Sequence, residues 1–551
     1  MRKGIKSIAV VGFLALAIVG FRSTTPGDRT FEIVKNLDIF ATLYKEVNAY
    51  YVDEIDPEVL MRTGIEAMLA SLDPYTNYIP EDDIEDYRTI TTGEYGGIGA
   101  AVDKKNGIST IVMPYEGYPA HKAGLKAGDQ IIKINGISIT EKPSDEISKL
   151  LKGQSKSDIV LTVKRFDKEK PFDVTLNRER ITIKNVPYFG LVSEDIGYLK
   201  LTDFTTEAGL EVRNAVNELK ADGATKIILD LRGNPGGLLE EAVNVSNVFI
   251  GKGREVVTTR GKLKNWTKTY NTLDEPADEQ IPVAVLISGS SASASEIVAG
   301  VIQDYDRGVL VGQRSFGKGL VQQTRPLAYN SQIKVTTGKY YIPSGRCIQA
   351  IDYSHRNPDG SIAKIADSLK AEFTTLSGRP VFDGGGVNPD IEVEVPQYAA
   401  ISYALMSGNF IFDYATSYYY SHPEIADAKE FRLTDAEYLQ FIEWLEGKDL
   451  NYVTQVEKDL EKLVASSKKA NYYDDIAEKI VELRDKAIET KKQDLQTFKK
   501  EIVHLLEQEI ASRYYYQRGI IEVAFDEDPD ILAATKVLGN QEEYQNLLKS
   551  N

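Results

Sequence analysis

The chain has 551 residues, of which 42% are hydrophobic and 27% charged, as in ordinary globular proteins. This length predicts about three or four domains, because one hydrophobic core rarely serves so many residues. The formal net charge of −17 argues against nucleic acid or an anionic membrane surface as the main partner. The single cysteine, Cys347, excludes a disulfide framework, and one cysteine with four histidines makes a zinc site unfavourable. We therefore expect no metal and no cofactor.

The N-terminus has the pattern of an export signal. A basic start is followed by an apolar run from Ile8 to Phe21, which matches the charged and hydrophobic regions of a signal peptide. The run is short for a membrane span, which needs about 20 apolar residues, and no small-x-small cleavage site follows it. Residues 1–26 are therefore predicted to be a signal peptide or a membrane anchor, with a buried helix as the alternative. We expect an exported, periplasmic protein that is soluble or tethered to the inner membrane.

Residues 30–84 are predicted to be an N-terminal helical segment. Apolar side chains from Ile33 to Tyr51 recur at spacings of three and four, which is typical of a helix with one apolar stripe. Asp56 and Pro57 then form a helix cap and a first-position proline, which predicts a second helix running toward Leu72.

Residues 85–180 change to a small module dominated by strands. Its expected strands and helical pieces are Ile108–Met113, Gln130–Ile134, Ile159–Lys164, Pro119–Gly128 and Pro143–Gly153. Residues 181–396 then alternate strands and helices, as in an α/β layered core. From about residue 397 the pattern is helical to residue 551. This last part is predicted to be a solvated helical extension, with a dimerisation or adaptor-docking arm as the alternative.

A candidate nucleophile follows a buried strand. The strand Val283–Ile287 runs into a Ser-rich turn that contains Ser293, and Glu296 then opens a helix. A serine at such a turn faces the positive end of the helix, where free N–H groups can stabilise an oxyanion. The pattern is not the Gly-x-Ser-x-Gly elbow of α/β-hydrolases. Taken alone, this feature favours a helix cap in a Ser-rich loop.

A candidate base lies in Gly317-Lys318-Gly319, within an apolar setting. A lysine at its ordinary pKa of about 10.4 is protonated, but burial among apolar groups lowers the pKa and allows the amine to deprotonate a serine. If the chain is extended after Lys318, Gln322 points to the same face and can hold the lysine.

A third motif, Asp230-Leu-Arg-Gly-Asn-Pro-Gly-Gly237, links a buried strand to a helix. Its Gly-Gly turn exposes backbone N–H groups and can supply half of an oxyanion hole, although a plain turn is the alternative. Asp230 and Arg232 are expected to have a structural role at least as readily as a catalytic one.

Together the strings LDLRGNPGG, SASASEIVAG, VGQRSFGKGLVQ and GGGVNPDIEV resemble the C-terminal processing peptidases, a family of Ser/Lys proteases. The resemblance covers roughly residues 30–395. It implies a ClpP/crotonase-like α/β protease core, with Ser293 as nucleophile, Lys318 as general base and Gln322 as its positioner. It also implies an oxyanion hole made by the Ala294 amide and the amide of Gly236 or Gly237. Tyr75 stands where the family commonly has histidine, which affects no catalytic group.

The strand-rich module resembles a PDZ domain. Tyr95-Gly-Gly97-Ile98-Gly99-Ala looks like its carboxylate-binding loop, and Pro119 to Gly136 like its most recognisable stretch. Consecutive amides at Gly97, Ile98 and Gly99 can hold a free C-terminal carboxylate, while the adjacent strand edge accepts the peptide. The resemblance thus implies an exported endopeptidase whose protein substrates are recognised by their C-terminal tails and whose PDZ domain gates the active site. Besides its substrates, the protein is considered to bind an adaptor protein or a second copy of itself.

Three alternatives stay open. A catalytically inactive PDZ scaffold would keep the fold without the chemistry. Gly312 to Lys318 matches seven positions of a phosphate-binding P-loop, but Gly319 stands where that motif needs Ser or Thr. A Ser-His-Asp triad would need His355, the only histidine in the core, which lies in a polar loop and is expected at the surface.

Overall fold

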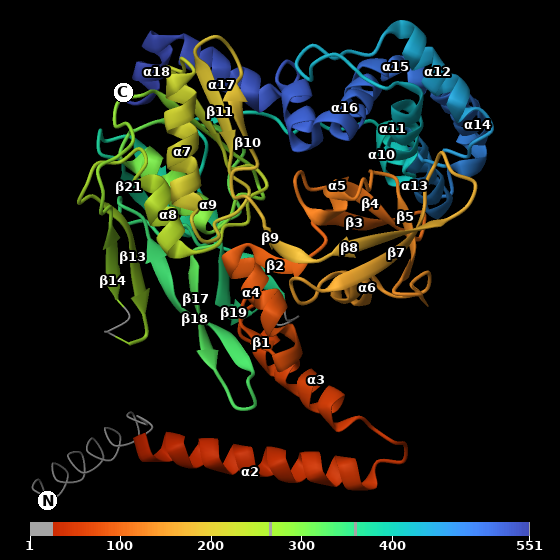
Figure 1. The fold of residues 1–551 in the computed structure, drawn as a ribbon. Helices are drawn as coiled ribbons and strands as arrows, with labels where there is room; N and C mark the ends of the chain where they lie inside the picture. Colours follow the sequence, from red (N-terminus) through yellow and green to blue (C-terminus); the bar gives the residue numbers. More distant parts are fainter. Residues whose placement is uncertain (1–25, 264–266, 357–360, 550–551) are drawn as a thin grey trace, which may run out of the picture. The chain divides into compact units, whose positions relative to one another are not determined.

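The computed structural model describes residues 26–263, 267–356 and 361–549 (Figure 1). The chain divides into two compact units, Met1–Tyr78 and Ile79–Asn551. The predicted signal or anchor run, Ile8 to Phe21, lies outside the described residues. Among the residues that are described, no helix combines the length and the apolar character that crossing a membrane requires.

The first unit consists mainly of two helices, α2 (Pro26–Tyr50) and α3 (Pro57–Ala70). The Asp56 carboxylate caps α3 by accepting the N–H groups of Glu58 and Val59, and Pro57 occupies the first turn, as the sequence predicts. Strand β1 (Asn77–Ile79) lies at the boundary between the units.

The second unit begins with η1 (Glu81–Asp83), α4 (Ile84–Thr92) and the strand-rich module. The module's strands are β2 (Glu94–Gly97), β3 (Ala100–Lys105), β4 (Ile108–Pro114), β5 (Gln130–Ile134), β6 (Ile137–Ser138), β7 (Asp158–Lys164), β8 (Phe172–Asn177) and β9 (Glu179–Thr182); its helices are α5 (Pro119–Lys122) and α6 (Ser144–Leu151). The sheet order β3-β4-β5-β7-β8 leaves one edge of β3 without a partner strand in the described structure. Strands alternate buried and exposed residues, as in β7, so one face of the sheet packs on a core of its own.

The largest sheet of the next segment is a parallel one with an antiparallel edge strand. Its order is β10 (Tyr188–Leu191), β11 (Ile196–Lys200), β12 (Lys226–Asp230), β15 (Val283–Ile287), β16 (Val309–Gly312) and β23 (Ile391–Glu392). Only β10 runs antiparallel to its neighbour. The alternation of strands and helices therefore forms the expected α/β layers.

Helices cover both faces of this sheet, and side chains alternate between the faces along each strand. On one face Leu229 and Val285 pack in a core with α7 (Ala208–Ala221), α8 (Leu239–Ser246) and α9 (Ala294–Asp304). On the other face Ile228, Ala284 and Leu286 pack against α17 (Pro529–Gly539) and α18 (Gln541–Leu547). Figure 1 draws α17 and α18, from the end of the chain, in blue at the top of this layer.

A second sheet and several short strand pairs complete this region. The sheet contains β13 (Glu255–Gly261), β14 (Lys268–Asn271), β17 (Leu320–Pro326) and β18 (Gln332–Tyr341). The pairs are β19 (Ile351–Arg356) with β20 (Ile362–Lys364), and β21 (Glu372–Thr374) with β22 (Pro380–Phe382); η3 (Asp367–Leu369) lies between them.

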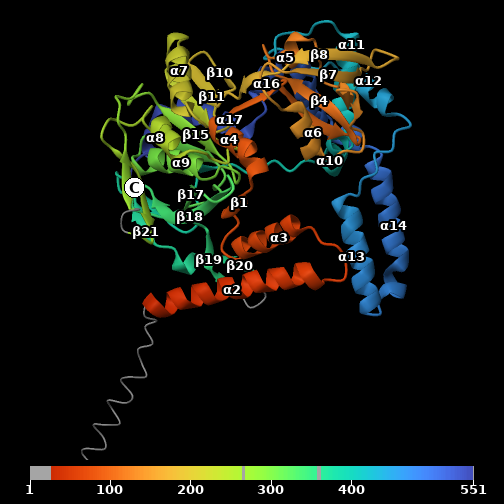
Figure 2. The same cartoon turned by 60° about the horizontal axis from the view of Figure 1, so that its bottom comes forward.

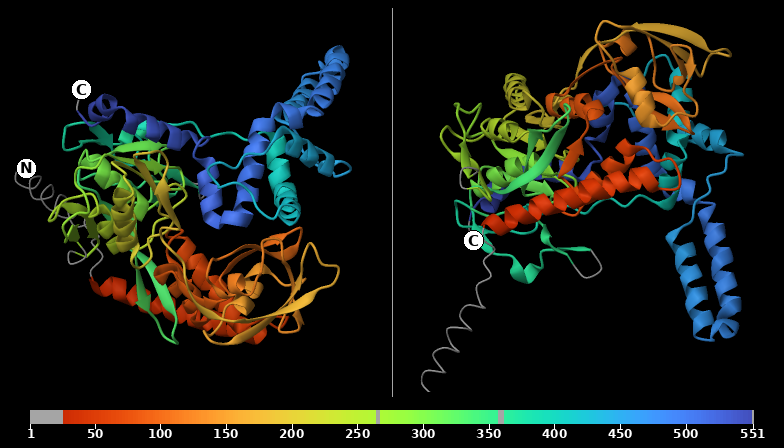
Figure 3. Two further views of the ribbon diagram at one scale, coloured as in Figure 1. Left: turned by 45° about the horizontal axis from the view of Figure 1, so that its top comes forward. Right: turned by 90° about the horizontal axis from the view of Figure 1, so that it is seen from below.

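The helical part consists of α10 (Ala400–Ser407), α11 (Phe410–Ser421), α12 (Asp435–Leu445), α13 (Gln455–Lys469), α14 (Tyr473–Lys491), α15 (Asp494–Thr497) and α16 (Lys499–Ala524). Thr434 and Glu437 form a capping box at the start of α12. Helices α10, α11, α12 and α16 share a core, whereas α13 and α14 lie side by side as a hairpin (Figures 2 and 3). Tyr516, with φ 53°, kinks α16 before the chain turns onto the parallel sheet.

Candidate active site

Ser293 occupies a sharp turn between β15 and α9. Its backbone has φ 57° and ψ −112°, a conformation that costs a non-glycine residue about 1–3 kcal/mol. The Ser293 N–H donates to Glu296 Oε2 at 2.9 Å, which holds the turn. The turn thus places Ser293 immediately before the N-terminus of α9, where backbone N–H groups have no partner within the helix.

The loop after β12 lies against this turn. A Cβ atom added to Gly236 would lie 2.8 Å from Ser293 Cβ and 2.8 Å from Ala294 N, so only glycine allows the approach. The Gly236 N–H donates to Asn234 Oδ1 at 2.9 Å. The Gly237 N–H makes no hydrogen bond within the described part of the chain. Of the two glycines between which the sequence left the choice open, Gly237 is therefore the better oxyanion donor, together with Ala294.

Glu296 joins the nucleophile turn to the lysine loop, residues 313–319. One carboxylate oxygen accepts Ser315 Oγ at 2.5 Å and Gly317 N at 2.7 Å. The other accepts Lys318 N at 2.9 Å as well as Ser293 N. The backbone N–H groups of Ser293 and Lys318, the two candidate catalytic residues, thus both donate to the side chain of Glu296.

Burial raises the pKa of Glu296 to about 7, against the four hydrogen bonds that lower it. The side chain is fully buried, and each of the four groups around it donates in the arrangement seen. Only the ionised carboxylate accepts all four hydrogen bonds, because a protonated oxygen must itself donate.

Tyr340 connects the same two residues on their carbonyl side. Its hydroxyl donates to Lys318 O at 2.5 Å and lies 3.1 Å from Ser293 O. Neither of these contacts of Glu296 and Tyr340 with the candidate residues is predicted by the sequence. The spacing of Glu296, three residues after a helix-capping serine, is a signal that could have drawn attention to it; Tyr340 has no comparable signal.

One cavity of about 400 Å³ brings the predicted residues together. Its lining includes Ser293, Ala294, Lys318, Gln322, Gly236 and Gly237. A register shift in the pairing of β17 with β18 falls between Val321 and Gln322, and the Gln322 amide donates to Thr336 Oγ1 at 3.2 Å. The bulge re-aims the side chain of Gln322, and its predicted role in holding Lys318 stays a prediction.

A second cavity, of about 210 Å³, lies in the strand-rich module. It is lined by Ile98, by Ala100 and Val102 of β3, and by Ile147 and Leu151 of α6, among others. These side chains provide an apolar groove along the unpaired edge of β3. Of the predicted carboxylate-binding residues, Ile98 lines the groove directly. Gly97 pairs with Glu179 of β9, and Gly99 adopts φ 70°, which favours glycine.

The structure gives less support to a Ser-His-Asp triad or a P-loop than to the Ser293 and Lys318 site. His355 is 85% exposed, pairs with Asp352 and is absent from the lining of the Ser293 cavity. Lys318 leads into strand β17 and not into the helix that a P-loop requires. Among the described residues no group of three or more His, Cys, Asp or Glu side chains could hold a metal ion.

Comparisons with known proteins find matches for three parts of the chain. Residues 195–359 match "Peptidase family S41", residues 110–165 a "PDZ domain", and residues 401–538 "Probable PDZ-protease, C-terminal helical domain". A "Carboxy-terminal-processing protease" of Bartonella bacilliformis is 39% identical over 356 residues, which make up 64% of this chain and 81% of the relative. A "Probable CtpA-like serine protease" of Staphylococcus aureus is 34% identical over 370 residues, 67% of this chain and 66% of the relative.

Among solved structures, the "Photosystem II D1 C-terminal processing protease" matches 64% of this chain and 92% of its own, with 25% identity and a TM-score of 0.35. The relative from Bartonella bacilliformis matches this chain over most of its own length, and the α/β core, the groove-bearing module and the helical part each match a described domain. The chain therefore belongs to peptidase family S41 and is a serine-type peptidase that carries a PDZ domain and a C-terminal helical domain.

Proposed function

We propose that this protein is a carboxy-terminal processing endopeptidase that uses Ser293 and Lys318 as a catalytic dyad. The observation that carries the proposal is the cavity shared by Ser293, Lys318 and the loop of Gly236 and Gly237. The Ser293 hydroxyl attacks a peptide carbonyl and gives its proton to the neutral Lys318 amine. The C–N bond then breaks, Lys318 returns the proton to the leaving amine, and water hydrolyses the acyl-enzyme.

The oxyanion that forms during attack is assigned to the N–H groups of Gly237 and Ala294. Both residues line the cavity beside Ser293, and Ala294 is the first residue of α9, so the positive end of the helix adds to the stabilisation. Gln322 is assigned to holding the Lys318 amine in place. Glu296 and Tyr340 set the backbone positions of the two residues through the hydrogen bonds described above.

The PDZ domain is proposed to select the substrate. Its groove joins an apolar surface, an unpaired strand edge and the loop Gly97 to Gly99, which suits an extended peptide that ends in a free carboxylate. The relatives named carboxy-terminal-processing proteases support this substrate class. Protein substrates with exposed, unstructured C-terminal tails follow as the expected partners.

The test uses two substrates and two variants. A fluorescent peptide with an apolar C-terminal tail should be cleaved by the wild type, and its C-terminal amide should have a KM at least tenfold higher because the carboxylate site is lost. Ser293→Ala and Lys318→Ala should fold, as judged by circular dichroism, and should neither cleave nor react with a fluorophosphonate. A folded wild type that Ser293-reactive probes do not label would instead favour the inactive scaffold.

Export to the periplasm is a separate proposal, supported by the basic and apolar N-terminal sequence. A fusion of residues 1–30 to alkaline phosphatase should be active in cells, since that enzyme needs an oxidising compartment. An inactive fusion would place the protein in the cytoplasm. The association with an adaptor or a second copy is best tested by deleting residues 455–491, the α13–α14 hairpin, and measuring the mass of the complex before and after.

A further inference from the structure

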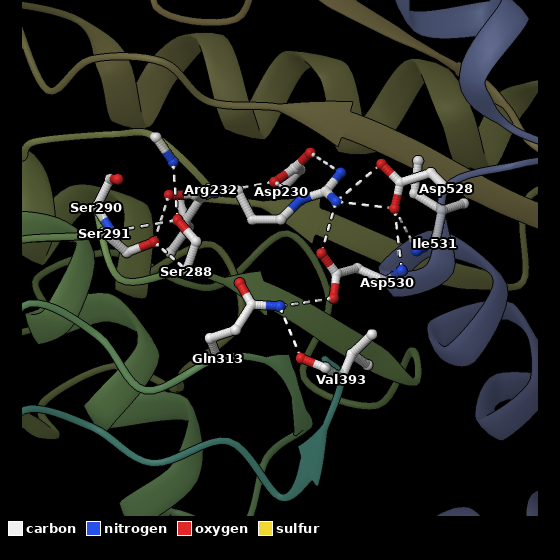
Figure 4. Close-up of polar contacts among 12 residues, drawn as sticks. Asp230, Arg232, Ser288, Ser290, Ser291, Gln313, Val393, Asp528, Asp530 and Ile531 are labelled. Carbon is white, nitrogen blue, oxygen red and sulfur yellow. Dashed lines mark hydrogen bonds and ion pairs between the residues drawn. The ribbon is translucent and has the colours of Figure 1, made fainter. Parts of the chain in front are cut away.

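The first turn of α17 lies at the edge of the parallel sheet from which the catalytic loops emerge (Figure 4). Asp528 caps the helix, since its Oδ1 accepts the N–H groups of Asp530 at 3.0 Å and Ile531 at 3.1 Å. Both aspartates belong to the C-terminal helical domain, which matches its own family over residues 401–538. Their side chains nevertheless point into the protease core (Figure 4).

Arg232 makes the first connection. It lies two residues after β12, in the loop that carries Gly236 and Gly237. Its Nη1 atom donates to both oxygens of Asp528 and to Asp530 Oδ2, each at 2.8 Å. The rest of the guanidinium donates to Asp230, at 3.0 Å from Nε and 2.8 Å from Nη2. One guanidinium thus fixes the start of the oxyanion loop to α17.

Gln313 makes the second connection. It follows β16 and begins the loop that leads to Lys318. Its side-chain amide donates to Asp530 Oδ1 at 3.3 Å and to Val393 O at 3.0 Å. Its backbone N–H donates to Ile287 O, the last residue of β15 before the nucleophile turn, at 3.0 Å. Asp530 therefore contacts the oxyanion loop with one oxygen and the lysine loop with the other.

The nucleophile turn is tied to the same cluster through serines. Ser291 Oγ donates to Leu231 O at 2.8 Å, and Ser288 Oγ accepts the Gly233 N–H at 3.3 Å. The three loops after β12, β15 and β16 (residues 231–238, 288–293 and 313–319) are thus held together on top of the first turn of α17 (Figure 4).

The charges of the cluster make this contact specific. Arg232 and Lys200 face three carboxylates, those of Asp230, Asp528 and Asp530. Asp230 is fully buried and Asp530 is buried as well. Water therefore has little access to these two carboxylates and does not readily replace their ion pairs. Two cations thus hold three carboxylates that come from two different parts of the chain.

We propose that Asp530, with Asp528, positions the catalytic loops, so that the C-terminal helical domain completes the active site of the peptidase. Asp530 touches neither substrate nor reacting atoms; it acts through Arg232 on the oxyanion loop and through Gln313 on the lysine loop. The inference rests on the proposed function. It predicts a loss in the chemical step, because peptide binding takes place in the PDZ groove and in other parts of the cavity.

The experiment compares Asp530→Ala with a matched control, Glu527→Gln. Glu527 lies in the same turn of the chain, but its partner is the exposed Lys500, at 2.9 Å, and not a catalytic loop. Asp530→Ala should lower the rate of fluorophosphonate labelling at Ser293 and kcat for the tailed peptide about tenfold or more, while KM changes less than twofold. Glu527→Gln should match the wild type in all three quantities.

Four outcomes decide between these possibilities. Equal labelling rates for the wild type and Asp530→Ala would overturn this inference, and so would a variant whose KM rises while kcat is kept. If Asp530→Ala does not fold, Asp530→Asn, which keeps the shape of the side chain, must still lower the labelling rate at least threefold. A folded wild type without any Ser293-dependent labelling would overturn the proposed function itself.

Discussion

Glu296 leads to a prediction in which activity and stability change with pH in opposite directions. The protonated side chain must donate a hydrogen bond where four groups already donate to it. Because the pKa of Glu296 is about 7, we expect kcat/KM to fall as the pH drops below 7. The fall should approach tenfold per pH unit, since the protonated side chain can no longer accept all four of the hydrogen bonds that join the Ser293 turn to the lysine loop.

The same shift stabilises the fold at low pH. The pKa is raised from 4.5 in the unfolded chain to about 7 in the folded one, so the folded protein binds the proton more tightly. The contribution, on the order of 3 kcal/mol, is fully present below pH about 4.5 and is lost as the pH rises through 7. Denaturant titrations from pH 4.5 to 8 should show this loss, apart from the contributions of other groups.

Glu296→Gln separates this effect from the pH dependence that the proposed lysine base would add, which also favours high pH. Glutamine offers one acceptor oxygen and one NH₂ group, so two of the four donors lose their acceptor. Each loss costs about 1–3 kcal/mol at a buried site, and the variant should lose most of its activity at pH 8 together with the stability change between pH 4.5 and 7. A variant that keeps the wild-type pH profile, or a wild type with constant activity between pH 6 and 8, would refute the reasoning.

Four further changes to the chain test the site and the elements that support it. Gly236→Ala should lower kcat about 10²-fold, as measured by single-turnover cleavage, because its Cβ would lie 2.8 Å from Ser293 Cβ; a normal kcat would show that the loop tolerates the displacement. Tyr340→Phe should lower kcat about tenfold and the free energy of unfolding by about 1 kcal/mol, since the hydroxyl no longer holds Lys318 O; unchanged kinetics would reduce Tyr340 to a packing residue. Truncation after residue 527 should prevent folding in a solubility and circular dichroism assay, whereas deletion of residues 455–491 should leave a folded enzyme. The truncation exposes the sheet face that α17 and α18 cover. Each apolar side chain exposed costs about 2 kcal/mol, and the sum over this face exceeds the typical stability of a whole protein.

The sequence predicted the parts of the site that depend on local patterns. The strand Val283–Ile287 and the helix that Glu296 opens place Ser293 at the carboxyl end of a buried strand. The Gly-Gly turn after β12 and the Gly-Lys-Gly loop after β16 follow the two strands that flank β15 in the same sheet. Because the carboxyl ends of parallel strands meet at one edge, the three loops lie together.

Contacts that depend on tertiary structure were not predicted. Glu296 was expected only to begin a helix, but its carboxylate also reaches Ser315, Gly317 and Lys318, which lie 19 to 22 residues further along the chain. Tyr340 reaches Ser293 O from the end of β18, 47 residues away. Neither contact leaves a periodic trace in the sequence, since each depends on how two sheets pack.

One pattern in the sequence did predict a cover of the kind that the C-terminal helices provide. All five residues of β15 are buried, and an uninterrupted apolar strand of this kind needs a cover on both faces of its sheet. Helices α7, α8 and α9 cover one face only, so another segment had to cover the second face. The charged faces of the segment after residue 397 predict a solvated extension, yet Ile531, Ala534 and Val537 of α17 supply that cover. In the structure α17 packs on this face with its first turn at the carboxyl edge of the sheet, where Asp530 reaches Arg232 and Gln313. The burial of α17 on the core thus keeps Asp528 and Asp530 beside the loops that follow β12 and β16.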